Sequence, residues 1–359
     1  MSSAFKVGPA AIVRRSESFH RWRSRKDKMA RWVIGLGGFV VITAVMLILF
    51  YLLYIVIPLF LPAKITQHSL GERQQWHAVR TAFLALEEQQ QLALRVSFEG
   101  VAEFFRLDEL HVLETIRLSD DGLQVALVVG EQGNGGLVAV AFENGKVRLF
   151  RHSYETDYSL GVEQRRVIPL LDFPYGDDLI DLMPNGGITG LALSDSESGL
   201  VLAAATADGR VRINWSEKQE DFLSGEISLH SSIRTLDVDF NITAITLSEN
   251  HRWLYLGDDT GIVHFIKIDG MQEAGSVQVS AAGISSMRML LGGISVLAGD
   301  ADGRITQLFP VRDEDNQYRL EVIRHFEAQQ SAITHIISEQ RRKGFISIDA
   351  SGNLAIYHS

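Results

Sequence analysis

The longest apolar run in the chain lies near its N-terminus. Residues 32–61 (WVIGLGGFVVITAVMLILFYLLYIVIPLFL) carry no charge, and none occurs between Arg31 and Lys64. About 20 apolar residues suffice for a helix to cross a bilayer, and a helix satisfies its own backbone hydrogen bonds there. Pro58 and Pro62 stop or kink such a helix near its far end. The pattern therefore predicts one transmembrane α-helix over 32–61.

Two other interpretations of this run compete with a membrane span. A cleavable signal peptide has an apolar core of roughly 7–15 residues and a small-residue cleavage site. This run is about twice that length and ends in LFLPAK. A buried core helix of this length without a charge is rarer still. The sequence therefore favours the membrane span.

After the span, a polar stretch at 62–80 is interpreted as a linker, and short segments of alternating apolar and polar residues follow. Six of them share a small or polar residue, a Gly, any residue and then an aliphatic residue. They are EGVAEFFRL (99–107), NGKVRLFRH (144–152), DGRVRINWS (208–216), TGIVHFIKI (260–268), DGRITQLFP (302–310) and SGNLAIYHS (351–359). Alternation with a period of two after a turn glycine predicts a strand that leaves a hairpin.

A second pattern precedes the last four of these segments. It consists of ITGLALS (188–194), ITAITLS (242–248), ISSMRML (284–290) and ITHIIS (333–338), each followed by another short apolar strand. Each unit thus has three strands with room for a fourth, and the glycines recur roughly 40–65 residues apart. Four strands per unit of this length are typical of a β-propeller, whose stacked blades bury faces that one sheet leaves open.

The region 81–359 is therefore predicted to be all-β, a WD40-like β-propeller of about six or seven blades, preceded by the transmembrane helix. The x-Asp-Gly-x-Val/Ile hairpin of WD40 blades is present, while the Gly-His and Trp-Asp dipeptides of true WD40 repeats are absent. An irregular β-sandwich of short strands is the alternative.

Charge is divided unevenly between the two sides of the apolar run. Residues 1–31 hold nine Lys or Arg and two Asp or Glu, so the net charge of −10 divides into +7 there and −17 in the rest. By the positive-inside rule this basic segment is expected in the cytoplasm. The main domain is then expected across the bacterial inner membrane, in the periplasm. An acidic body argues against nucleic-acid binding, which needs a basic surface.

Composition narrows the chemistry further. A hydrophobic content of 46% allows a packed core. The absence of Cys excludes disulfides, Cys-ligated zinc, iron–sulfur clusters and a thiol nucleophile. GEQGNGG (130–136) lacks the Lys-Ser/Thr of a phosphate-binding loop and is expected to be a flexible hairpin. RDEDN (312–316) lacks the Gly and the distal Glu of an EF-hand loop and is expected to be an exposed turn.

The acidic stretch DFPYGDDLIDLMPNGG (172–187) leaves two interpretations open, a calcium site and a solvated loop that enters the next blade, which is favoured. Its four carboxylates belong to Asp172, Asp177, Asp178 and Asp181. The eleven His form no H-E-x-x-H motif, and His325 and His335 are expected to be surface or hydrogen-bonded core residues. No catalytic, cofactor-binding or metal-binding residue is assigned, and no cofactor is expected.

The order of these features resembles a known family. A basic head, RSRKDKMARWVIGLGGFVVI (23–42), FYLLYIVIPLFLPAKI (50–65) and an acidic WD40-like body follow one another. This order resembles the N-terminal part of the long-form phosphate ABC-transporter permease of proteobacteria, the PstC type. The resemblance covers essentially the whole chain and is most specific at KDKMARW (26–32) and YLLYIVIPLF (51–60). It implies a large periplasmic propeller-like region after the first transmembrane helix, with the other permease helices later.

No second apolar 20-mer follows Leu61, so the resemblance implies a fragment of a longer permease or a split gene product, without transport-site residues. It implies a docking or regulatory module in phosphate import. The expected partners are the second permease, the ATPase, the phosphate-binding protein and membrane lipid.

Two other function classes remain open. One is a single-span anchored scaffold for an envelope protein complex. The other is a propeller enzyme, which would need a polar, ion-binding channel that no sequence cluster indicates. The chain is therefore expected not to be an enzyme.

Overall fold

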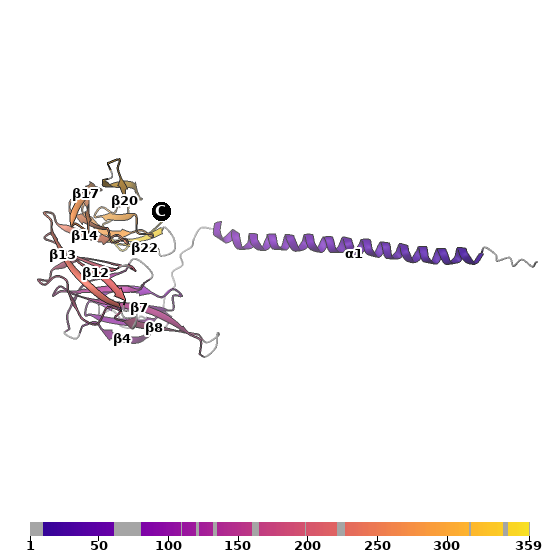
Figure 1. Ribbon diagram of the computed structural model, residues 1–359, viewed down its shortest axis with the longest axis horizontal. Coiled ribbons are helices and arrows are strands. Elements are labelled where there is room, and N and C mark those ends of the chain that lie inside the picture. The colour runs from indigo at the N-terminus through magenta and orange to yellow at the C-terminus, as the bar shows by residue number, and fades with distance from the viewer. Residues whose placement is uncertain are drawn as a thin grey trace, which may run out of the picture. The chain divides into compact units, whose positions relative to one another are not determined.

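The computed structural model describes residues 10–60, 80–108, 110–119, 122–131, 135–159, 165–197, 199–220, 227–315, 317–339 and 344–358. Its contacts divide the chain into two compact units, Met1–Gly71 and Glu72–Ser359. The described part of the first unit is helical, and that of the second consists of strands and their connections (Figure 1).

The helical unit consists of α1 (Ala10–Val56) and a short 3₁₀-helix, η1 (Ile57–Phe60). Within α1 the segment Lys26–Val56 is long and apolar enough to cross a membrane, and none of its most apolar stretch is buried. Among the described residues it is the one helix that meets these criteria. The predicted linker, 62–80, lies outside the described residues except for Arg80.

The helix begins earlier than the predicted boundary at residue 32. Between Ala10 and Arg31 the sequence has neither Gly nor Pro, and Arg, Lys and Ala favour a helix. The basic segment therefore continues the helix of the apolar run, and the change in polarity does not end the element. At the other end α1 stops at Val56, just before Pro58 removes a backbone donor.

The second unit folds into antiparallel sheets, of which the first three hold strands β1 to β13. Sheet 1 consists of β1 (Thr81–Leu86), β2 (Leu92–Ser97), β3 (Val101–Arg106) and β4 (Val112–Arg117). Sheet 2 consists of β5 (Val125–Gly130), β6 (Leu137–Phe142), β7 (Lys146–Asp157), β8 (Arg166–Asp172) and β9 (Ile180–Asp181). Sheet 3 consists of β10 (Ile188–Asp195), β11 (Gly199–Thr206), β12 (Arg210–Glu220) and β13 (Ile227–Asp237).

The remaining three sheets follow the same plan. Sheet 4 consists of β14 (Ile242–Leu247), β15 (Trp253–Asp258), β16 (Ile262–Lys267) and β17 (Gln272–Gln278). Sheet 5 consists of β18 (Ile284–Met289), β19 (Val296–Asp300), β20 (Ile305–Arg312) and β21 (Tyr318–His325). Sheet 6 consists of β22 (Ile333–Ser338), β23 (Gly344–Asp349) and β24 (Leu354–His358). Apart from β9, which pairs with β7, neighbouring strands in every sheet are consecutive in the sequence.

The six predicted turn glycines are confirmed. Each lies between the second and third strands of one sheet, with φ between 75° and 88°, in the left-handed region that Gly adopts without strain. They are Gly100, Gly145, Gly209, Gly261, Gly303 and Gly352. A Cβ at Gly145 would overlap the carbonyl oxygen of Met183. The sequence pattern thus located one equivalent turn in each sheet.

An acidic residue three positions before the glycine caps this turn in the last three sheets. Asp300 Oδ1 accepts the backbone N–H groups of Asp302 at 3.0 Å and Arg304 at 2.8 Å. Asp258 and Asp349 make the same two bonds in their own sheets. All three are buried, so these charge-assisted hydrogen bonds fix the hairpins firmly.

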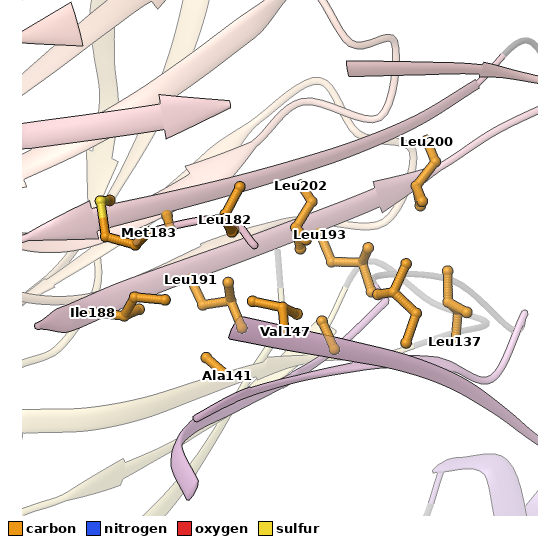
Figure 2. Close-up of a cluster of buried hydrophobic side chains, with 13 residues drawn as sticks. Leu137, Ala141, Val147, Leu182, Met183, Ile188, Leu191, Leu193, Leu200 and Leu202 are labelled. Carbon is orange, nitrogen blue, oxygen red and sulfur yellow. The ribbon is translucent and has the colours of Figure 1, made fainter. Parts of the chain in front are cut away.

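Five clusters of buried apolar residues each join two neighbouring sheets, from sheets 1 and 2 to sheets 5 and 6. Figure 2 shows the cluster in which Leu137 and Val147 of sheet 2 meet Leu191, Leu193 and Leu202 of sheet 3. Sheets stacked face to face in chain order make the second unit a WD40-like β-propeller, as predicted. The alternative of a β-sandwich fails, because a sandwich has only two packed sheets.

The segment 172–187 differs from the solvated loop that the sequence favoured. Ile180–Asp181 forms β9, which pairs with β7. Leu182 and Met183, which follow, are buried in the cluster between sheets 2 and 3. The apolar pair after the acidic positions draws the segment onto the core, because its burial outweighs the preference of the neighbouring carboxylates for water.

The two other predicted connections each lie between two paired antiparallel strands, as expected. Residues 130–136, of which 132–134 lie outside the described residues, join the antiparallel strands β5 and β6. Residues 313–315 lie in the turn between β20 and β21, while Arg312 ends β20 and residue 316 lies outside the described residues. There the Gln317 N–H donates to Asp313 Oδ1 at 2.8 Å.

Candidate functional site

The first strand of a sheet ends at or near a carboxylate in five of the six sheets. These carboxylates belong to Glu87 after β1, Glu131 after β5, Asp195 at the end of β10, Glu249 after β14 and Glu339 after β22. Sheet 5 has Leu290 and Leu291 in their place. Because all six first strands pair with their second strands in the same register, their ends lie at the same face of the propeller.

A pocket of about 430 Å³ opens where four of these strand ends converge. Its lining includes Glu131, Asp195, Glu249 and Leu291, one residue from each of sheets 2 to 5, with Ser194 beside them. The charged residues in this lining are all acidic. The pocket therefore suits a ligand group that is positively charged or rich in N–H donors.

Asp195 is well supplied with partners inside the protein. Lys218 Nζ lies 2.5 Å from Asp195 Oδ1, Tyr175 donates its hydroxyl to Oδ2 at 2.9 Å, and Arg151 approaches Oδ2 at 3.4 Å. Burial alone would lower the pKa of Lys218, but its hydrogen bonds to Asp195 and Tyr175 outweigh burial, and the pKa is raised. Lys218 and Arg151 balance the negative charge of Asp195, and their contacts with it join sheet 2 to sheet 3.

The negative charges of Glu131 and Glu249 are less well balanced by neighbouring groups than that of Asp195. Glu131 Oε2 is buried and has no hydrogen-bond partner among the described residues. Burial first, and the negative charge of Asp195 second, raise the pKa of the Glu131 carboxyl. Burial also raises the pKa of Glu249. The protein therefore disfavours negative charge at both positions, and a cation bound in the pocket would favour it.

Arg288 of β18 reaches from sheet 5 to sheet 2 beside this pocket. Its two terminal nitrogens approach the carbonyl oxygens of Gly130 at 3.5 Å and of Glu131 at 3.4 Å. Its Nε has no partner among the described residues, and burial lowers the pKa of the guanidinium. Both contacts are at the long end of hydrogen bonding, so Arg288 links the two sheets only weakly.

The structure does not bring together the His and Asp residues that the sequence analysis considered as candidates for a metal site or a catalytic site. His325 and His335 are both exposed, and His325 Nδ1 lies 2.9 Å from Thr306 Oγ1. The four Asp of 172–187 are exposed as well. Within the described ranges no group of three or more His, Asp or Glu side chains could hold a metal ion.

Sequence reasoning missed the pocket residues, although a signal was present. Three copies of the second repeat pattern, 188–194, 242–248 and 333–338, are each followed at once by an acidic residue. These residues are Asp195, Glu249 and Glu339. Alignment of the repeats on their first strands, rather than on their turn glycines, would have placed the three carboxylates at one edge.

Comparison with known proteins concerns the fold. The propeller is similar to the solved structure of the Dos1 propeller, with a TM-score of 0.49 and 14% identity over 78% of each chain. It is also similar to a chain of the mitotic checkpoint complex, with a TM-score of 0.49 and 12% identity over 81% of this chain and 77% of that one. A third is the computationally designed Ika8 protein, with a TM-score of 0.45 and 17% identity over 79% of this chain and 72% of that one.

The sequence itself gives no closer relationship. No protein-family model matches it, and no curated protein matches it. Its likeness to the solved structures, at 12–17% identity, concerns the fold alone.

Proposed function

We propose that the chain is a membrane-anchored β-propeller that docks partner proteins, and that it is the propeller portion of a phosphate ABC-transporter permease in the bacterial inner membrane. The observation that carries the proposal is the combination of the unburied apolar helix Lys26–Val56 with a propeller whose strand ends form an acidic pocket. Loops held on a rigid scaffold are well suited to protein recognition.

The anchor is supported by exposure and by charge. The apolar residues of α1 from Trp32 to Val56 are exposed, and an aqueous environment does not tolerate an apolar surface of that size. A bilayer supplies the apolar medium, and the helix keeps its backbone hydrogen bonds within it. The basic residues before Trp32 favour a cytoplasmic N-terminus, with the propeller on the periplasmic side.

Phosphate transport rests on the resemblance of residues 26–32 and 51–60 to the long-form permease. The acidic pocket does not favour phosphate itself, since like charges repel at distances below about 8–10 Å, beyond which salt screens them. We therefore assign the propeller to docking or regulation beside the phosphate-binding protein and not to collection of the anion. The other expected partners are the second permease, the ATPase and membrane lipid.

Topology is tested with reporters fused to the end of the full chain. Alkaline phosphatase is expected to be active there, and green fluorescent protein dark, because only the former folds to activity in the periplasm. The matched control replaces the basic residues between 21 and 31 with Gln, which removes the charge asymmetry and is expected to mix the two orientations. A fluorescent, phosphatase-inactive fusion of the unaltered chain would contradict the proposed orientation.

Partners are tested by cross-linking in phosphate-starved cells followed by capture of the full chain. Recovery of the second permease, the ATPase or the phosphate-binding protein is expected. A chain in which an unrelated span replaces 32–61 separates partners of the propeller from partners of the helix. Recovery of envelope assembly factors without any transporter subunit would instead favour the alternative, an anchored scaffold for an envelope complex.

A further inference from the structure

The sheets of the propeller stack by a simple rule. In sheets 3, 4 and 5 the fourth and sixth residues of the first strand point toward the preceding sheet and are buried there. In sheet 3 these are Leu191 and Leu193, 7% and 2% exposed, which pack on sheet 2. In sheet 4 they are Ile245 and Leu247, 9% and 1% exposed, which pack on sheet 3.

Sheet 1 departs from this rule. The fourth and sixth residues of β1 are Leu84 and Leu86, and both are 56% exposed. Their neighbours Phe83 and Ala85 point the other way and pack on sheet 2. The face of β1 that should meet a preceding sheet therefore lies open.

Sheet 6 is open on its opposite face. Ile337, Ile346 and Ile356 are directly opposite one another on three paired strands, so they share one face, and Leu354 lies on it as well. Ile337, Leu354 and Ile356 are 53%, 56% and 58% exposed. The other face carries Phe345, which is buried against sheet 5.

The edge of sheet 6 is also incomplete. In each of sheets 1 to 5 the third strand pairs with a fourth. In sheet 6 the third strand, β24, pairs with β23 and with no other described strand. None of the five buried clusters of the described residues joins sheet 6 to sheet 1.

We propose that this open seam, formed by Leu84, Leu86, Ile337, Leu354 and Ile356, binds a seventh four-stranded sheet of the same repeat. Polypeptide outside residues 1–359 supplies this sheet. The two faces of the seam are the two faces that each of the five internal interfaces buries, so a sheet with the same pattern fits between them. The undescribed residues 61–79 are fewer than the roughly 40 residues that one such sheet occupies. The inference rests on the stacking of the sheets and not on a role in phosphate transport.

The repeat itself supplies a probe for the test. Gly352 is equivalent to Gly261 in the turn before the third strand, so position 359 corresponds to position 268. A copy of residues 269–326 appended after Ser359 continues the repeat in phase. It supplies the equivalent of β17 as the fourth strand of sheet 6 and a copy of sheet 5 as the seventh sheet.

Thiol labelling reads out the closure, because the chain has no Cys of its own. Leu84→Cys and Ile356→Cys are made one at a time in the full chain, with and without the appended copy. Ile323→Cys, at a residue that is 51% exposed on β21, is the control away from the seam. The appended copy is expected to slow maleimide labelling at positions 84 and 356 at least tenfold and to leave position 323 unchanged. A scrambled 269–326 segment appended at the same place is expected to protect neither position 84 nor position 356 from labelling.

Other outcomes overturn the proposal. Slow labelling of both seam positions in the unextended chain, independent of concentration, would show that the seam is already closed. Slow labelling that is lost on dilution would identify a second copy of the chain as the occupant. Protection at position 356 alone would mean that an edge strand binds without a sheet. The proposal would also be refuted if the in-phase copy left labelling at positions 84 and 356 unchanged. In that case the labelling rate at position 323 and the circular dichroism spectrum of a β-protein must be the same as without the copy, to show that the chain is folded.

Discussion

The stacking rule makes a quantitative prediction for two leucines at equivalent positions. Leu247 and Leu86 are both the sixth residue of a first strand, but Leu247 is 1% exposed and Leu86 is 56% exposed. Leu247→Ala removes buried carbon atoms and leaves a cavity between sheets 3 and 4. Substitutions of this kind lower the free energy of unfolding by about 2–5 kcal/mol.

Leu86→Ala is expected to cost much less. Less than half of its side chain is out of water, and no packed neighbour is left facing a cavity. At about 0.8 kcal/mol per fully buried CH₂ the loss is about 1 kcal/mol or less. The two variants should therefore differ by at least about 1–2 kcal/mol, although they make the same chemical change at the same place in the repeat.

Urea unfolding of the full chain in detergent, followed by far-ultraviolet circular dichroism, measures this difference. The dependence of the unfolding free energy on urea should be the same for both variants, so that the midpoints report stability directly. Equal losses for Leu86→Ala and Leu247→Ala would refute the stacking rule and, with it, the open seam.

Three further predictions concern turns, titration and the centre of the propeller. Asp300→Ala should lower the free energy of unfolding by about 1–3 kcal/mol, because two backbone donors lose a buried acceptor, while the exposed Asp302→Ala serves as its control in the same urea titration. The folded pKa values of Glu131 and Glu249 are raised above the usual 4.5, so the folded chain holds these protons more tightly than the unfolded one, and stability falls as pH rises from 4.5 through the raised values. Glu131→Gln should accordingly shift the urea midpoint upward at pH 7.5 and leave it unchanged near pH 4, whereas Glu314→Gln in an exposed turn should shift neither; a downward shift at pH 7.5 would contradict the assignment. Arg288→Met should change the free energy of unfolding by less than about 1 kcal/mol, because the lost contacts are long and an unpartnered buried Nε is removed; a loss above 3 kcal/mol would show that Arg288 is a main tie between sheets 2 and 5.

The sequence predicted the propeller because its strongest signals are local. A turn glycine with positive φ and a strand of alternating residues leave their mark within about ten residues, so Gly100 and its five equivalents were located correctly. Most of the predicted apolar run, residues 32–56, also lies within one helix. The start of this helix at Ala10 was missed, because a change from charged to apolar residues reflects the surroundings of a helix and not its ends.

What the sequence did not disclose depends on contacts between distant segments. The pocket brings together Glu131, Asp195 and Glu249, which are separated by whole repeats and look like ordinary surface charges in any local window. Leu182 and Met183 were assigned to a solvated loop because acidic neighbours dominate their stretch, while their burial depends on how sheets 2 and 3 meet. Exposure at Leu84 and Ile356 is likewise a property of the stack and not of either strand.

The chain order of the strands has a consequence for how the propeller is made. Apart from β9, each strand pairs with the one just before or after it. A polypeptide that leaves the ribosome with its N-terminus first can therefore complete each sheet from residues that have already been synthesised. Such local pairing keeps loop-closure costs small and folding fast. Each new sheet then covers the face left by the last, and the nascent domain exposes one advancing apolar surface at a time. The first sheet is the exception: its outer face, with Leu84 and Leu86, forms earliest, and no later sheet of the described residues covers it. It is therefore the surface that a chaperone would need to shield longest.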